Sequence, residues 1–238
     1  MKVNYIRHSG FLLEWDNCYW LFDYYRDRIP ELDPNKSLFV FVSHDHEDHF
    51  NEEIFNMFGG RDKTLFLLSE DCDLWGLEPD VDIVTLKPNE HYVYNDFFGK
   101  DIDVTTLEST DQGVAFLIKY MGRTVYFSGD LHWWDWPGEM SPGEREDMKR
   151  RYFREVEKLR GVKIDLAFAV LDPRQHEIAW QGIDKLMRTA DVDLVIPIHM
   201  WRRFKLIERF KELETSADYR DKVLYYDEEK PTITLWQA

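Results

Sequence analysis

Long apolar runs, cysteines and basic residues are all scarce in this sequence. No stretch approaches the roughly 20 consecutive apolar residues that a membrane-spanning helix needs. The N-terminal residues show no charged segment followed by an apolar core, so they do not indicate a secretion signal. The two cysteines, Cys18 and Cys72, lie outside any CxxC pair, which favours buried free thiols over a disulfide. We therefore expect a cytoplasmic protein that does not enter a membrane.

Basic residues are fewer than acidic residues in this chain. The 46 acidic and 30 basic residues give a formal net charge of −16. Nucleic acid is bound mainly through Lys and Arg contacts to phosphate, and a strongly acidic chain repels it at long range. The densest basic stretch, residues 149–154, lies among acidic residues and is typical of a solvated helix face. We expect a small-molecule substrate and no nucleic-acid partner, and the sequence leaves the oligomeric state open.

Apolar residues are nevertheless numerous enough for one sizeable core. They make up 44% of the 238 residues, so we expect a single domain over residues 1–238. Short strand-like runs dominate the first half, and strands alternate with helices in the second. This order predicts an α+β layered sandwich of two mixed sheets packed face to face, with helices outside. The expected strands span residues 2–6, 11–15, 19–23, 37–43, 64–69, 81–85, 102–107, 114–120, 124–128, 165–171, 194–198, 223–226 and 232–236, and the expected helices begin near residues 51, 141, 178 and 204.

The segment HDHEDH at residues 44–49 directly follows a nearly continuous apolar run. It holds three of the chain's eight histidines. Imidazole and carboxylate together suit zinc and related divalent ions. In an extended loop His44 and His46 project to the same side, and a turn at Asp48 and His49 aims the next pair at a second point. We interpret the segment as a metal-binding cluster.

The pattern HxHxDH after an apolar strand resembles the signature of the metallo-β-lactamase superfamily. That resemblance implies an αβ/βα sandwich of two mixed sheets. It also implies that His44 and His46 bind one metal, whereas Asp48 and His49 bind a second.

Other residues follow in the order that the family has. Asp130, in Ser-Gly-Asp at a strand end, matches the acid that bridges both metals in that family. His199, also at a strand end, matches the late histidine that completes the second site. Asp23 ends an earlier strand, where the family usually has an acid that supports the site.

One ligand that the family normally has is missing. The stretch before the bridging acid, residues 107–116, contains no histidine. The first site therefore keeps two histidines and the bridging acid, although zinc usually takes three protein ligands and water. Three outcomes stay open: Glu108 or Asp111 substitutes and favours a harder ion such as Mn²⁺, His132 reaches in, or only the second site is occupied.

Four further residues are candidates for substrate binding. His8 precedes a serine, as in the lactonase-like branch of the family, which resembles ascorbate-6-phosphate lactonases; a turn or capping role fits it equally. His132 follows the bridging acid by two residues, within reach of the cleft rim. Asp172 and Arg174 lie in a polar loop after a strand, where active sites gather. They suit an anionic group, and a surface salt bridge explains them at least as well.

These features predict a metal-dependent hydrolase of a small ester, lactone or phosphodiester that uses metal-activated water. Asp48 and Asp130 are the expected catalytic residues, because they would hold and orient the attacking water. We expect one or two divalent ions per chain, zinc first, with manganese and iron as alternatives. The oxidoreductase branch of the family has Glu where His46 stands, which favours hydrolysis. The competing interpretation is a degenerate member that binds metal or a ligand without turnover.

Overall fold

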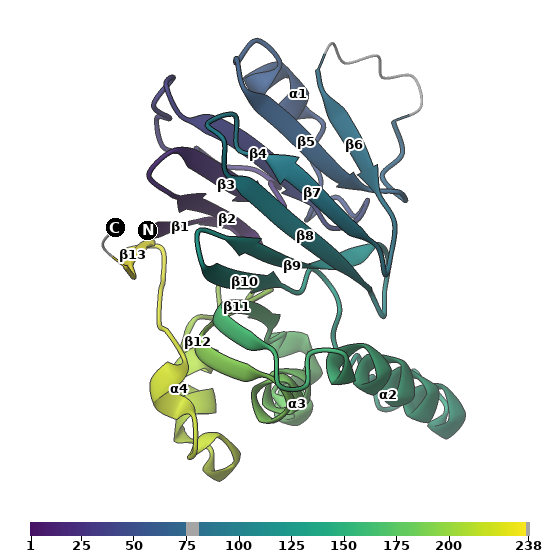
Figure 1. Cartoon of the computed structure of the whole chain (residues 1–238). Coiled ribbons are helices and arrows are strands. Elements are labelled where there is room, and N and C mark those ends of the chain that lie inside the picture. Colours follow the sequence, from purple (N-terminus) through teal and green to yellow (C-terminus); the bar gives the residue numbers. More distant parts are fainter. Residues whose placement is uncertain (75–80, 237–238) are drawn as a thin grey trace.

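Two β-sheets packed face to face form the centre of the computed structural model, which describes residues 1–74 and 81–236 (Figure 1). Each sheet is mixed, because β3 to β6 and β10 to β12 run parallel whereas the other pairs are antiparallel. In spatial order the first sheet contains β13 (Thr232–Thr234), β1 (Lys2–Arg7), β2 (Gly10–Glu14), β3 (Cys18–Phe22), β4 (Ser37–Val42), β5 (Thr64–Ser69) and β6 (Ile83–Leu86). The second contains β12 (Asp191–Ile198), β11 (Lys163–Val170), β10 (Arg123–Phe127), β9 (Val114–Tyr120), β8 (Asp101–Glu108) and β7 (His91–Asn95).

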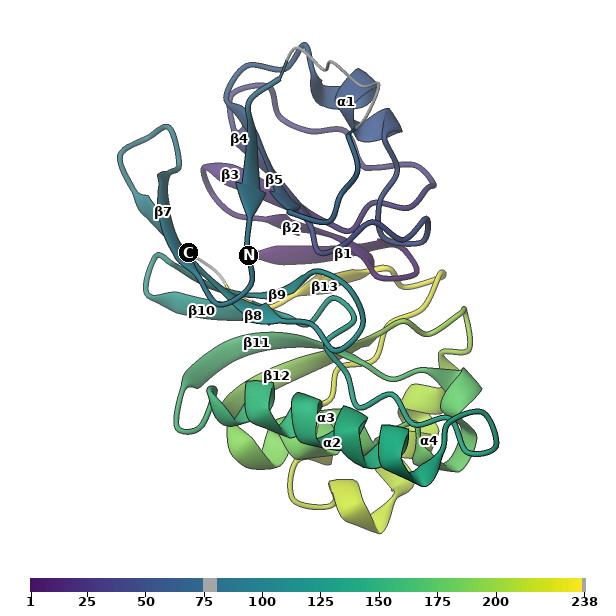
Figure 2. The same ribbon diagram turned by 90° about the vertical axis from the view of Figure 1, so that its right-hand side faces the viewer.

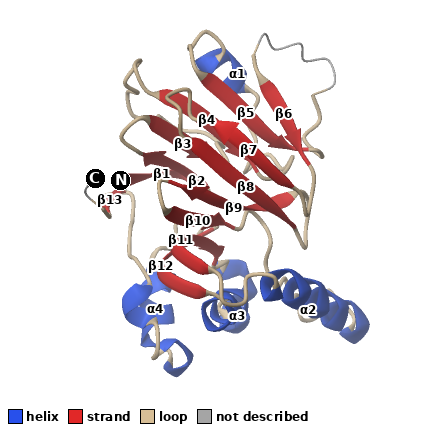
Figure 3. Ribbon diagram, in the orientation of Figure 1, coloured by secondary structure: helices blue, strands red, loops and turns tan. Residues whose placement is uncertain are grey.

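Helices cover the outer side of each sheet, as the turned view shows (Figure 2), and Figure 3 distinguishes helices from strands in the orientation of Figure 1. The first sheet carries α1 (Glu53–Phe58), and the second carries α2 (Pro142–Glu157), α3 (Gln181–Thr189) and α4 (Lys205–Glu212). The layered sandwich that the sequence predicts is therefore confirmed. Within the described ranges, every helix falls short of the length and apolarity that crossing a bilayer requires.

The strand before the histidine segment is buried on both faces. Every residue of β4 is buried. Phe39 and Phe41 point into the core between the sheets, whereas Val40 and Val42 pack toward α1. The alternation of side chains along a strand explains this division, because successive residues face opposite sides. A nearly continuous apolar run is what such a strand needs.

Two sequence expectations need correction. The expected strand at residues 223–226 is not formed, since only Val223 makes a bridge, to Val195 of β12. The chain then turns at Asp227, whose carboxylate accepts hydrogen bonds from the backbone amides of Glu229 and Lys230. Conversely, β7 was not expected. It is an edge strand whose residues alternate between exposed and half-buried, so it lacks the apolar run that marks the inner strands.

A stack of three aromatic rings joins the sheets beneath the loops that follow β3, β4 and β10. Phe22 of β3 lies parallel to Phe41 of β4, with ring centroids 4.9 Å apart, and to Phe127 of β10, at 4.5 Å. All three side chains are fully buried. Stacked rings contribute packing beyond the area that they bury. This stack fixes the spacing of the sheets where the three loops leave them.

We expect Phe22→Ala to lower the free energy of unfolding by about 3–5 kcal/mol, because it opens a cavity inside the stack. Val93→Ala is the matched control, since Val93 on β7 is 55% exposed and its truncation should change stability by less than about 0.5 kcal/mol. Equilibrium urea unfolding measures both. Equal losses in the two variants would show that the stack does not hold the sheets together.

Candidate metal centre

The candidate residues follow the carboxyl ends of strands in both sheets. Asp23 follows β3, His44 lies two residues after β4, and Asp130 follows β10 by three residues. Asp172 and His199 come just after β11 and β12. Parallel strands end at a common edge, so their loops gather there. The sheet topology therefore brings side chains from distant parts of the sequence to one edge of the sandwich.

Asp130 lies at the middle of this group. Its Oδ1 is 3.3 Å from His49 Nε2 and 3.6 Å from His199 Nε2. Its Oδ2 is 3.8 Å from His44 Nε2. Each carboxylate oxygen thus faces a different set of histidines, which is the arrangement that a bridging acid requires. We name the His44 and His46 side the first half, and the Asp48, His49 and His199 side the second half.

The first half is sparse and open. His44 Nε2 lies 3.0 Å from His46 Nδ1, and Asp111 Oδ2 lies 3.7 Å from the same His46 nitrogen. The side chains of His46 and Asp111 are 38% and 42% exposed. Glu108 instead pairs with Arg154 at 2.8 Å. Of the two acids considered as substitutes for the missing histidine, Asp111 is the one beside this half.

A glycine allows the Asp111 loop to approach. Gly113 has φ +67°, and a Cβ there would lie 1.9 Å from the Ser43 carbonyl oxygen. Val114 N donates to the same carbonyl at 2.9 Å. Only glycine permits both this conformation and this contact. The loop therefore lies directly against the residue that precedes His44.

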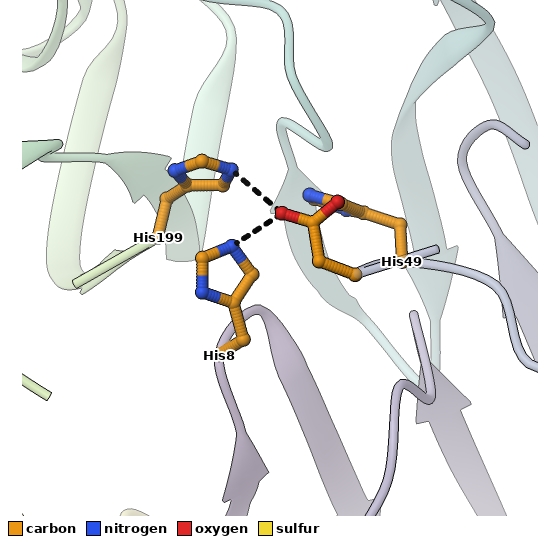
Figure 4. A group of neighbouring side chains, drawn as sticks. His8, His49 and His199 are labelled. Atoms are coloured by element: carbon orange, nitrogen blue, oxygen red, sulfur yellow. Dashed lines mark ion pairs between the residues drawn. The ribbon is translucent and has the colours of Figure 1, made fainter. Parts of the chain in front are cut away.

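The second half is crowded, and its histidine rings are buried, whereas the Asp48 side chain is 24% exposed. His8, from the turn between β1 and β2, places its Nε2 3.1 Å from Asp48 Oδ2 (Figure 4). His199 Nε2 lies 3.7 Å from that same oxygen, and the His8 and His199 ring centroids are 4.1 Å apart. His49 joins them, so that ligand atoms of all four residues lie within 4.8 Å of one another.

Carboxylates hold the ring orientation of two of these histidines. Asp23 Oδ2 lies 2.7 Å from His49 Nδ1, and Asp172 Oδ2 lies 2.9 Å from His199 Nδ1. In both residues Nε2 is left to face Asp130. Metal-binding histidines are commonly fixed in this way, because the second ring nitrogen donates to an acid and the first keeps its lone pair.

Ser43 holds the ring orientation of His44, and the sequence did not point to Ser43 as a site residue. Its hydroxyl donates to Asp23 Oδ2 at 2.7 Å and lies 2.9 Å from His44 Nδ1. Its backbone N donates to Asp23 Oδ1 at 2.8 Å. The available signal was a serine directly before the first histidine, at the end of a buried strand. Ser43 and Asp23 together orient His44 and support both halves.

Burial sets the protonation of the histidines. Burial foremost lowers the pKa of His49 and of His199 to about 3, and it lowers the pKa of His44 well below its ordinary value. All three rings are therefore neutral at neutral pH and keep the lone pairs that metal binding needs. Burial, followed by the charge of Asp48, raises the pKa of Asp130 well above its ordinary value. A nearby divalent cation would reverse that shift.

These side chains fit a divalent cation. Among the described residues, His8 Nε2, His49 Nε2 and Asp130 Oδ1 are buried without a hydrogen-bond partner. Such an atom costs about 1–3 kcal/mol unless something satisfies it. Ligands about 2.1 Å from a tetrahedral zinc are about 3.4 Å apart, and the facing atoms of the second half are separated by 3.1–3.7 Å.

Three residues of this centre have strained backbone conformations. His8, Asp23 and His199 have φ values of +53°, +41° and +64°. Non-glycine residues in the left-handed region cost free energy and persist where the surroundings determine them. Each of the three is tied to a neighbour by the contacts above.

Three of the residues expected to bind substrate contact other residues of the chain. His132 is buried, its Nε2 lies 2.6 Å from Gln175 Oε1, and it belongs to no metal-holding group of the described residues. It therefore does not reach into the first half. Asp172 is fully buried, accepting from Arg174 Nε at 2.8 Å in addition to contacting His199. Arg174 itself is half exposed, and its guanidinium stacks 4.9 Å from the ring of Trp201.

Known proteins resemble this chain in fold. A family model described as beta-lactamase superfamily domain matches residues 2–135. The structure is similar to Igni18, a novel metallo hydrolase from the hyperthermophilic archaeon Ignicoccus hospitalis, with 15% identity, a TM-score of 0.65 and 99% of each chain covered. It is also similar to an isothiocyanate hydrolase from Delia radicum gut bacteria, with 13% identity, a TM-score of 0.58 and 99% of each chain covered.

A third structure carries different chemistry. CmlA, a diiron β-hydroxylase from Streptomyces venezuelae, is 16% identical with a TM-score of 0.54, and the match covers 84% of this chain and 45% of CmlA.

No curated protein sequence matches the chain. At such identities the solved structures show a shared fold, which hosts more than one reaction. The family model, however, spans more than half of the sequence and includes the HxHxDH segment, so the chain belongs to the beta-lactamase superfamily.

Proposed function

We propose that this chain is a metal-dependent hydrolase that attacks a small ester, lactone or phosphodiester with water. The observation that carries the proposal is the Asp130 carboxylate, which turns one oxygen toward each half of a histidine-rich centre. Zinc is the first choice of ion because nitrogen and oxygen ligands converge at suitable spacing. Manganese and iron are the alternatives, because carboxylates form a large share of the ligands.

A bound divalent cation would polarise the carbonyl or phosphoryl group of the substrate. It would also lower the pKa of a water molecule toward about 7, so that hydroxide is available at neutral pH. The chain's own residues do the rest. Asp130 lies between the halves, so its carboxylate can accept the proton of a water placed there and orient the remaining lone pair. Asp48 fixes the second half through its contacts with His8 and His199. The water oxygen then bonds to a carbonyl carbon or a phosphorus atom, the bond from that atom to the alcohol oxygen breaks, and the departing oxygen takes up the proton that Asp130 accepted.

Solvent access favours entry of the substrate from the first half. The His46 and Asp111 side chains are partly exposed, whereas His49 and His199 are fully buried. Trp201 is 42% exposed and its ring centroid lies 5.7 Å from that of His199, so it can form an apolar part of the rim.

The acidic surface charge opposes long nucleic acids and leaves a small molecule as the proposed substrate. Both cysteines are free, which fits the proposed cytoplasmic location.

One observation favours a second candidate, a metal-binding protein without turnover. Only His44, His46 and Asp130 form the metal-holding group of the first half within the described stretches. If that half holds its ion too weakly, the second half alone would bind metal. The same experiment separates the two candidates.

We expect the chelator-treated protein to hydrolyse nothing and to regain activity when Zn²⁺, Mn²⁺ or Fe²⁺ is added. Metal analysis gives the number of ions per chain, and a panel of lactones, esters and bis-nitrophenyl phosphate reports turnover. Failure to retain any of these ions would refute the hydrolase proposal. Retained metal with every substrate class untouched would instead support the binding protein.

We expect Asp130→Asn to lower kcat/KM for the best substrate by at least about 100-fold, because the amide cannot accept a proton or bridge two cations. The matched control is Asp103→Asn on β8, a partly exposed acid that pairs with His91 at 3.1 Å. Steady-state kinetics of both variants measure the effect. Activity in Asp130→Asn comparable with that of the control would contradict the role of Asp130.

A further inference from the structure

His8 lies outside the HxHxDH segment, yet its ring belongs to the second half. Only 4% of the residue is exposed. Its Nε2 is buried and makes no well-aligned hydrogen bond among the residues that the structure describes, although the acceptor Asp48 Oδ2 lies 3.1 Å away. A buried ring nitrogen beside a carboxylate oxygen, without a well-aligned hydrogen bond between them, is the arrangement expected of two ligands that face one cation.

The surroundings hold this ring in place. The backbone N of His8 donates to the Tyr5 hydroxyl at 3.0 Å. The ring packs against Trp201 and His199, with centroid separations of 4.4 and 4.1 Å. The left-handed φ of +53° is kept by these contacts. His8 therefore presents its Nε2 to the second half in a defined orientation.

The distances agree with a shared ion. His8 Nε2 and His199 Nε2 lie 3.1 and 3.7 Å from Asp48 Oδ2 (Figure 4). Both lengths lie within the separations of about 3.0–4.2 Å between ligands that are about 2.1 Å from one five-coordinate ion. The ligand atoms of His8, Asp48, His49 and His199 lie within 4.8 Å of one another, and Asp130 Oδ1 faces the last two at 3.3 and 3.6 Å.

We propose that His8 is a fifth protein ligand of the ion in the second half, added to Asp48, His49, Asp130 and His199. The inference rests on the proposed metal centre and goes beyond it. Five side chains are more than the four protein ligands of a structural zinc site and leave no position for water, whereas catalytic zinc keeps one open. The second half is therefore a closed, tight site, and the first half is the open site where the ion exchanges and substrate binds.

The test is metal binding by His8→Gln and His8→Asn, with His91→Gln on exposed β7 as the matched control. Gln can still donate a hydrogen bond to Asp48 but carries no imidazole nitrogen, and Asn tolerates positive φ. Chelator competition measures the two affinities separately, and the visible absorption of the Co²⁺ protein reports the coordination number. We expect both His8 variants to weaken the tighter ion about 100-fold or more, to change the Co²⁺ spectrum, and to leave the weaker ion unchanged.

Wild-type affinity and spectrum in both variants would overturn the proposal. So would rescue by Gln alone, because His8 would then act through a hydrogen bond to Asp48. If neither variant folds, ¹⁵N NMR of the histidines in the unaltered protein decides. His8 Nε2 should shift to a metal-bound position with the first equivalent of Zn²⁺, and an unshifted signal would refute the ligand.

These outcomes are distinct from failure of the hydrolase. A protein that hydrolyses none of the panel but shows the tight site and its dependence on His8 would keep the inference and lose the proposed activity. If the protein is a hydrolase but its affinity for the tighter ion does not change in the His8 variants, the proposed activity is kept and the inference about His8 is lost.

Discussion

A buried carboxylate facing three buried imidazole nitrogens is the constraint on which the structure depends. Asp130 and the rings of His44, His49 and His199 are all almost fully buried, and His49 Nε2 and Asp130 Oδ1 have no protein hydrogen-bond partner in the described stretches. Unsatisfied polar groups in a core are destabilising. A divalent cation would remove this cost, since it binds the lone pairs and offsets the negative charge of the surrounding acids.

The scaffold brings these groups together through close backbone contacts. Gly113 and Gly129 both lie against Ser43, where a Cβ would fall 1.9 Å from its carbonyl oxygen and 2.6 Å from its Cβ, respectively. Both glycines have positive φ. Two loops of the second sheet can therefore rest on the end of β4, which carries the histidine segment. The stacked rings of Phe22, Phe41 and Phe127 lie beneath that contact.

The asymmetry between the halves gives them different chemical roles. Burial of the histidine rings in the second half keeps them neutral, which favours tight binding of an ion. Exposure of His46 and Asp111 in the first half leaves room for water and substrate. The absent mid-chain histidine is thus part of a coherent pattern, because an open half with few protein ligands is where an exchangeable position belongs.

The sequence by itself determined the layered sandwich, because strand and helix periodicities are local, and it determined the histidine segment, because HxHxDH is contiguous. It also pointed to Asp23, Asp130 and His199 as strand-end residues. Only the tertiary structure placed Asp111 rather than Glu108 beside His46, buried His132 against Gln175, and brought His8 to Asp48. These contacts join residues far apart in the chain. They depend on loop conformation and on the spacing of the two sheets, which no local pattern of residues encodes.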